Sequence, residues 1–456
     1  MARLILKIIN MKKVWIIVFG LSCLGLSAQK KWSLRECVDY AVEHNLQVIQ
    51  NQYSKQIQDS NLKMAKNQYL PSVSGTMSNS VSFGQTSFGT GSLRNDRFSN
   101  SANLGADILL YNNGRLEKNI RKSQFDVEAS QYDVETIKND ISLQIAQQYL
   151  TTLLNKEIVK ISESAVENAQ KQYDRAKITT QVGTTAQTIL AEAEAALARE
   201  KQNKKTAEIN VGRSLFAMAQ LLQLPDYKDF DVEYVEVPDQ LEPQLKSVDE
   251  VLTTAFENQP QVKAAESRIN SALAQTEVSK TAFWPTLTAS VGIGSFYNNL
   301  LNTDNIGNEL IYVKEKKFFQ QYKDNFGQQG SISLNVPIFN KGITKLQVEQ
   351  AKINESVAKI TLEQQKQTVR QNVQKAQFDV DANYETFLSA VETEKSTKLA
   401  LEFADKSYAA GRTTIYDVNV ARNNYANAQG SVAQAKYNYL FSLKLLNFYA
   451  GIPLAL

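Results

Sequence analysis

Residues 115–182 decide the fold: RLEKNIRKSQFDVEASQYDVETIKNDISLQIAQQYLTTLLNKEIVKISESAVENAQKQYDRAKITTQV, between Gly114 and Gly183. This run contains no glycine and no proline, and most of its residue types are compatible with helix. Apolar side chains recur at spacings of three, four and seven, in a thin stripe made of Leu116, Ile120, Val127, Val134, Ile137, Ile141, Ile145, Tyr149 and Leu153. The pattern predicts one coiled-coil helix, roughly 100 Å long at about 1.5 Å per residue.

Residues 343–410 repeat this design. They form a second run of the same length, between Gly342 and Gly411, again without glycine or proline. Their apolar stripe consists of Ile343, Leu346, Ile353, Val357, Ile360, Val369, Val373 and Ala376. After each terminal glycine a second helical segment follows, 185–222 or 413–448, and Pro225 or Pro453 closes it. The sequence therefore predicts two long helical hairpins.

Further matches between the halves indicate an internal duplication. Residues 41–43 (AVE) match 255–257 (AFE) at an offset of 214, and 110–114 (LYNNG) match 338–342 (IFNKG) at an offset of 228. One insertion, as long as the difference between these offsets, explains the change. We interpret the chain as two repeats, 29–225 and 247–456, joined by an acidic connector, 226–246. Each repeat is expected to begin with a helical segment, 33–69 or 247–283, and the second segment to break at Pro260.

Between these helices lie segments with the period of two that is typical of strands, about 72–111 and about 286–339. In one of them, Leu287, Ala289, Val291 and Ile293 alternate with Thr286, Thr288, Ser290 and Gly292. The alternative is a pair of soluble hairpins, but solvated sheet faces usually carry Lys and Glu, and residues 72–93 carry no charge. We therefore predict four membrane strands with an apolar lipid face and a polar lumen face. The inserted residues fall within 298–325, in a loop expected to face the exterior.

Residues 1–28 have the order of a secretory signal. Met11-Lys12-Lys13 precedes an apolar run that ends in small residues, so cleavage is expected after Ala28. Two alternatives stay open. One is a signal anchor, for which the apolar run is short. The other is lipidation at Cys23, where Gly20 stands in the place that usually holds Leu.

Composition excludes several classes of function. Without the leader the chain has 46 Lys and Arg against 47 Asp and Glu, so a nucleic-acid partner has no electrostatic support. The body holds one histidine, His44, and one cysteine, Cys37, which leaves no disulfide within one mature chain, no His/Cys zinc cluster and no catalytic triad with support nearby. We expect neither an enzyme nor a cofactor.

The duplicated plan and three local signatures resemble the TolC family of outer-membrane efflux channels over essentially the whole mature chain. Residues 257–262 (ENQPQV) are similar to the family's Asn-Pro helix start, with one residue intervening. Residues 408–418 (YAAGRTTIYDV) resemble its turn at the periplasmic helix tip, and 437–439 with 451–453 resemble its C-terminal helix ending.

This resemblance implies a mixed α and β membrane protein, a homotrimer in which four strands per protomer form one twelve-stranded β-barrel, continued by a long α-helical barrel across the periplasm. Strand geometry independently supports a barrel made by several chains, because four strands cannot close a barrel and an open edge in lipid leaves backbone groups unpaired. The implied function is the passive exit duct of a tripartite efflux or type I secretion system. Its implied partners are outer-membrane lipid, a periplasmic adaptor and an inner-membrane pump of the RND or ABC type. The alternative is a secreted coiled-coil structural or adhesive protein, which leaves the uncharged strands unexplained.

The resemblance also implies a periplasmic gate at the second helix tip. The matching positions are Tyr408, Arg412 or Thr413, and Asp417, whose three copies would form a ring of negative charge. The family's second acid is replaced by Val420, and the first-half equivalent of Asp417 is Ile189. The alternative interpretation is purely structural: Arg412 is a cation in the turn, and Asp417 is a solvated acid at a helix start. The turns at Gly183-Thr184 and Gly411-Arg412 are the implied adaptor contacts, although glycine is also the usual residue at helix C-termini.

Overall fold

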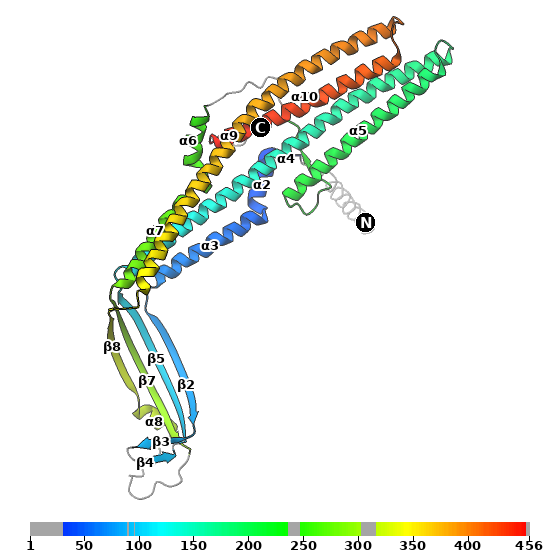
Figure 1. Ribbon diagram of the computed structural model, residues 1–456. Coiled ribbons are helices and arrows are strands. Elements are labelled where there is room, and N and C mark those ends of the chain that lie inside the picture. Colours follow the sequence, from blue (N-terminus) through cyan, green and yellow to red (C-terminus); the bar gives the residue numbers. More distant parts are fainter. Residues whose placement is uncertain (1–30, 89–90, 95, 236–246, 302–315, 453–456) are drawn as a thin grey trace, which may run out of the picture. The chain divides into compact units, whose positions relative to one another are not determined.

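The computed structural model describes residues 31–88, 91–94, 96–235, 247–301 and 316–452 (Figure 1). The predicted leader, including Cys23 and Ala28, lies outside the described residues, as do parts of the connector and of the second hairpin loop. The chain divides into two compact units. One contains the chain to Tyr53, Tyr132–Lys263 and Gln364 onward; the other contains Ser54–Gln131 and Ala264–Glu363. No helix in the described part of the chain combines the length and apolar character needed to cross a membrane.

Four helices make the two long hairpins. Helices α4 (Arg115–Gln181) and α9 (Ile343–Ala409) have 67 residues each, and α5 (Gln187–Leu221) and α10 (Ile415–Tyr449) have 35 each. All eight helix ends lie within two residues of the predicted ones. The return helices begin slightly later than expected because Ala186 and Thr414 keep an extended backbone as N-cap residues.

The core of the first unit lies where α2 (Leu34–His44), α4, α5 and α10 meet. Four residues of the predicted α4 stripe, Ile141, Ile145, Tyr149 and Leu153, are buried in it. The predicted α9 stripe behaves differently along its length. Val369, Val373 and Ala376 are fully buried, whereas Ile343, Leu346, Ile353, Val357 and Ile360 are all more than half exposed.

The first helical segment divides in two, and the prediction of one helix over 33–69 is wrong at Asn45. Helix α2 ends at His44 and α3 (Leu46–Asn67) begins after Asn45, whose backbone is extended. The Asn45 side chain accepts a hydrogen bond from the Gln47 N–H at 2.8 Å, as expected of a good N-cap residue. The second repeat breaks at the equivalent Gln259, between α6 (Val248–Asn258) and α7 (Pro260–Lys280), as expected; α7 continues into a short 3-10 helix, Thr281–Phe283.

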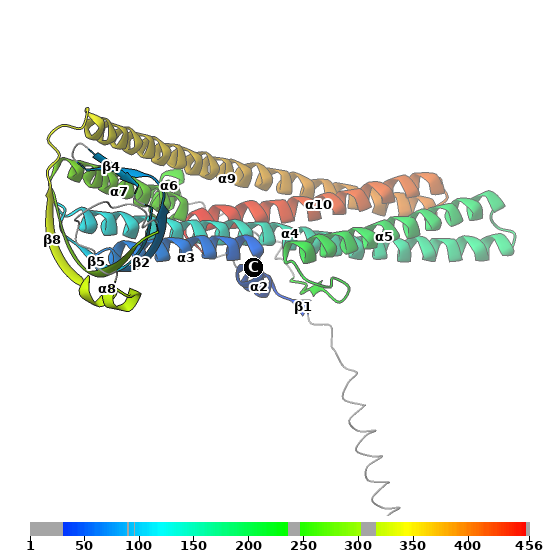
Figure 2. The same ribbon diagram turned by 90° about the horizontal axis from the view of Figure 1, so that it is seen from below.

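One antiparallel sheet dominates the second unit. Its strands are β2 (Ser72–Ser82), β5 (Arg97–Tyr111), β7 (Thr286–Leu300) and β8 (Gly327–Asn335), in that order. Strand β8 ends four residues before the predicted end of the second hairpin, because Pro337 has no N–H to donate to a ladder. Figure 2 shows the curvature of this sheet. Both edge strands, β2 and β8, lack a partner on one side within the described chain.

Five short elements of the described chain were not predicted. Strands β3 (Gln85–Phe88) and β4 (Gly91–Arg94) extend the first hairpin, and helix α8 (Phe318–Asp324) lies in the second hairpin loop. Strand β1 (Lys31–Trp32) pairs in parallel with β6 (Asp231–Val232), which lies in the predicted connector. A pairing between segments so far apart in sequence leaves no local pattern.

Candidate functional site

The two helix tips close with the same backbone geometry. Gly183 and Gly411 have φ values of +79° and +70°, a region that glycine enters without steric cost. The Thr184 N–H donates to the Thr179 carbonyl at 3.0 Å, and the Arg412 N–H donates to the Ser407 carbonyl at 2.9 Å. These bonds satisfy carbonyls left free at the helix ends. The implied adaptor contacts at Gly183, Thr184, Gly411 and Arg412 are thus exposed residues of hydrogen-bonded turns.

Asp417 is held by the turn that precedes it. Its Oδ2 accepts hydrogen bonds from the Thr413 hydroxyl at 2.7 Å, the Thr414 hydroxyl at 2.6 Å and the Thr414 N–H at 3.1 Å. The Asp417 N–H donates back to Thr414 Oγ1, which completes a capping box. The Thr414 and Thr413 hydroxyls lower the pKa of the Asp417 carboxyl, so this exposed group keeps its negative charge.

The structure brings together only part of the predicted gate. Thr413 and Asp417 are in contact, whereas no hydrogen bond or ion pair joins Tyr408 or Arg412 to Asp417 within the described chain. Tyr408 is half-buried and Arg412 is exposed. At the first tip, Ala186 provides no side-chain cap, so the acid and its hydroxyl partners belong to the second tip only.

Two features beside the tip were not found from sequence. Arg422, on α10, has a side chain only 15% exposed and lies 3.6 Å from the Asp405 carboxylate of α9. A hollow of about 310 Å³ lies beside Asp417 between the same two helices, lined by Thr397, Ala400, Tyr416, Val420, Ala421 and Asn424. No spacing rule signals an ion pair across a hairpin of this length.

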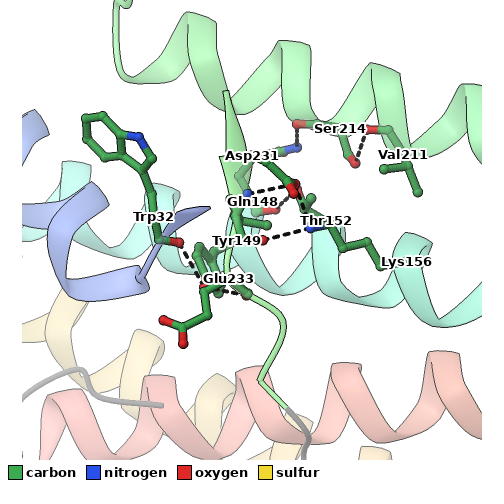
Figure 3. A network of polar contacts seen from close by, with 10 residues as sticks. Trp32, Gln148, Tyr149, Thr152, Lys156, Val211, Ser214, Asp231 and Glu233 are labelled. Carbon is green, nitrogen blue, oxygen red and sulfur yellow. Dashed lines mark hydrogen bonds and ion pairs between the residues drawn. The ribbon is translucent and has the colours of Figure 1, made fainter. Parts of the chain in front are cut away.

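A second polar cluster ties β1 and β6 to α4 (Figure 3). The single proton of the Tyr149 hydroxyl is shared between two carbonyls, that of Glu233 at 2.8 Å and that of Trp32 at 3.2 Å. Lys156 Nζ donates to Asp231 Oδ1 at 2.6 Å and to the Val232 carbonyl at 2.7 Å. Part of the acidic connector is thus fixed on α4.

Burial governs the chemistry of this cluster. It raises the pKa of the Tyr149 hydroxyl and raises the pKa of the nearby Cys37 thiol to about 12. Both groups are therefore neutral, and a neutral buried thiol is a poor nucleophile. No group of three or more His, Cys, Asp or Glu residues that could hold a metal ion occurs among the residues that the structure describes.

The sheet has two chemically distinct faces. On one face, paired rows are polar, as in Ser72, Asp107, Ser290 and Ser331. On the other, the equivalent rows are apolar, as in Val73, Ala106 and Val291. The polar face is concave: Ser74, Thr76, Ser101, Asn103, Asp107 and Ser290 line a hollow of about 480 Å³, whose edges also include Phe296, Leu104, Val291 and Ile293. Val73, Met77, Val291 and Ile332 are each more than 60% exposed on the opposite face.

Solved structures share this fold. CusC, which was solved in conformations that accompany folding and transmembrane channel formation, superposes with a TM-score of 0.71 at 17% identity, covering 92% of both chains. The CmeC outer membrane channel of Campylobacter jejuni superposes with a TM-score of 0.72 at 21% identity, covering 92% of this chain and 85% of that one.

Relatives found by sequence are outer-membrane proteins as well. The outer membrane efflux protein BepC of Brucella suis is 22% identical over 420 residues, which cover 89% of this chain and 83% of BepC. Outer membrane protein TolC of Escherichia coli is 25% identical over 315 residues, which cover 67% of this chain and 60% of TolC. The profile of the outer membrane efflux protein family matches residues 38–222 and 251–451. The chain belongs to this family of bacterial outer-membrane channel proteins.

Proposed function

We propose that this chain forms the passive exit duct of a tripartite efflux or type I secretion system. The observation that carries the proposal is the two-faced sheet: an uncharged apolar face exposed on the convex side and a polar hollow on the concave side. In a membrane this arrangement suits lipid outside and water inside. The substrates would be small molecules or exported proteins that pass through without being bound.

The duct requires three copies of the chain. Strands β2 and β8 each leave one edge unpaired within the described chain, and an unpaired edge in lipid costs several kcal/mol per polar group. The exposed part of the α9 stripe, from Ile343 to Ile360, likewise needs a partner surface. A homotrimer supplies both, as a twelve-stranded barrel continued by a helical barrel.

The gate would lie at the second helix tip. A ring of three Asp417 carboxylates would favour cations, and their hydrogen bonds to Thr413 and Thr414 would hold the charges in place. Tyr408 and Arg412 would close the resting tip by polar links to neighbouring copies. Such links would lie between chains, so they are compatible with the finding that neither Tyr408 nor Arg412 contacts Asp417 within one described chain.

The proposed partners are those that the family resemblance implies, and the sequence contains no nucleotide-binding motif that would supply energy from this chain. Energy would come from an inner-membrane pump of the RND or ABC type, and an adaptor would dock on the exposed turns at Gly183-Thr184 and Gly411-Arg412. Exposed apolar side chains beside the first turn, Ile178 and Val182, suit such a contact. A related protein of Pseudomonas putida is named for pyoverdine export.

Planar-bilayer recording with the purified full chain tests this function. A duct with a closed tip should show small, cation-selective conductance, and Tyr408→Phe combined with Arg412→Ser should raise it severalfold. Glu392→Gln with Lys395→Gln, an exposed pair on α9, serves as the matched control. A protein that inserts into the bilayer but never conducts would contradict the duct, and unchanged conductance in the tip variant would contradict only the gate.

A further inference from the structure

The apolar band on the convex face stops at a defined row of the sheet. The row of Val73, Ala106 and Val291 is apolar. The next row holds Leu104 and Ile293, with Gln328 at its end on the edge strand β8, whereas the row of Asn79, Asn100 and Tyr297 is polar. Ser295, the last position before this row, is the tenth residue of β7. A membrane strand needs about 9–11 residues to cross the hydrocarbon layer. The polar row therefore marks the outer boundary of that layer.

Helix α8 packs on the convex face at this boundary. Ser295 Oγ donates to the Tyr322 carbonyl at 2.6 Å, and the Tyr322 hydroxyl donates to Asn100. The rings of Phe318 and Tyr297 lie 4.9 Å apart, and Phe98 lies 6.2 Å from Tyr297. These contacts fix α8 over β7 and β5, and they place a cluster of aromatic rings where barrels carry their interfacial girdle.

The outward side of α8 combines one large apolar ring with cations. Phe319 is 84% exposed, and Lys323, four residues later, shares its helix face. Lys317, at the start of the helix, and Lys323 are exposed, whereas Lys316 is ion-paired with Asp324. An exposed ring between two exposed cations matches the boundary between acyl chains and anionic headgroups.

Another copy of the chain is a poor occupant for this surface. Neighbouring copies would pair at the edge strands β2 and β8, whereas α8 leans from β7 toward the inner strand β5. We propose that α8 is an interfacial anchor: Lys317 and Lys323 bind phosphate-bearing headgroups of the outer leaflet, and Phe319 inserts beside them at the edge of the acyl chains. The equivalent loop of the first repeat lacks the inserted residues, and α8 is the one helix of a hairpin loop in the part of the chain that the structure describes.

Lipid binding by the full-length protein in detergent tests the anchor. The probes are bisphosphorylated lipid A and the same lipid with its phosphates removed. A surface lysine contributes about fivefold to the binding of an anionic lipid, so Lys317→Gln with Lys323→Gln should weaken binding of the phosphorylated probe about thirtyfold. Binding of the dephosphorylated probe should not change. Lys352→Gln with Lys398→Gln, two exposed lysines of α9, is the matched control.

A depth measurement separates this anchor from the proposed duct. A spin label at Phe319→Cys should report headgroup depth, one at Val291→Cys the acyl-chain interior, and one at Ser290→Cys an aqueous surface. Native Cys37 is fully buried and will not take the label. Equal affinity of the wild type for both lipids, wild-type lipid A binding by the lysine variant, or an aqueous label at position 319 would each overturn the anchor. An aqueous label at 291 would overturn the membrane sheet itself. Inorganic phosphate that displaces lipid A and binds equally well without lipid would show a free-anion site instead.

Discussion

At the scale of single residues, Asp417 combines a structural and a proposed functional role. As the third residue of a capping box it starts α10, and as an exposed carboxylate it would line the entrance. Sequence alone placed this acid at a helix start, because it follows the glycine turn at Gly411 by less than two helical turns. The capping box with Thr414 is seen only in the structure. The sequence did not predict the ion pair between Arg422 and Asp405, which joins the two helices of the hairpin.

Replacing Asp417 should change ion selectivity and its pH dependence. Because hydrogen bonds from Thr414 and Thr413 lower its pKa, the carboxylate loses its charge at a lower pH than an ordinary aspartate does. Wild-type cation preference should therefore persist from neutral into mildly acidic pH, and Asp417→Asn should reduce it severalfold over that whole range. The measurement is reversal potential in planar bilayers under a salt gradient. Asp379→Asn, mid-way along α9, is the control, and an unchanged reversal potential in Asp417→Asn would leave the cap as its only role.

Tyr149→Phe should destabilise the first unit. The change removes the donor to the Glu233 carbonyl, at a cost of about 1–3 kcal/mol, whereas the Trp32 carbonyl still accepts from the Glu233 N–H at 2.9 Å. Tyr439→Phe is a matched control, because Tyr439 is fully buried and its hydroxyl has no hydrogen-bond partner within the described chain. Thermal unfolding followed by circular dichroism should show a lower midpoint for Tyr149→Phe only. Equal midpoints for the two variants would show that the tether does not stabilise the unit.

At the scale of elements, the periodicity of the sequence predicted those helices and strands that depend on residues close together in the chain. The long helices followed from glycine- and proline-free runs, and β2, β5 and β7 from alternation. The parallel pair β1–β6 and the packing of α8 depend on contacts between distant segments, so no local pattern in the sequence predicted them. The break at Asn45 did have a local signal, a good N-cap residue inside an apolar-periodic run, but without a proline it was overlooked.

Charge on the sheet should be tolerated on one face only. Val291 is 62% exposed on the convex face, and Ser290 lies on the polar face paired with Asp107 and Ser331. In lipid, Val291→Arg should cost about 2–4 kcal/mol if the residue lies near the bilayer midplane, and less near its edges. Ser290→Arg should cost clearly less. Folding into lipid vesicles, measured by urea titration, compares the two variants, and equal costs would rule out this assignment of faces.

At the scale of the whole molecule, the number of strands limits the number of copies. An eight-stranded barrel has an interior just wide enough for its own side chains, so two chains would give no duct. Three chains give twelve strands and a lumen. The unpaired edges of β2 and β8 in the described chain indicate that partner chains are needed. The proposed number of three follows from the lumen that a duct requires.

Cysteine cross-linking between edge strands should stop at three chains. With Ser333→Cys in β8 held fixed, a scan of Ser72→Cys, Ser74→Cys, Thr76→Cys and Ser78→Cys in β2 should find one register that forms disulfides between copies, because a disulfide requires Cα atoms within about 7 Å. All these positions lie on the polar face, where a small thiol is tolerated. Denaturing gels should then show bands of one, two and three chains, and single-cysteine variants should show none of the higher bands at the same oxidant concentration. The third bond joins the first and last chains into a closed ring, which migrates differently from a linear trimer. A series of bands that ends at two chains would leave the edges open in lipid. A series that continues past three chains would mean a wider barrel. Either outcome would contradict the trimer.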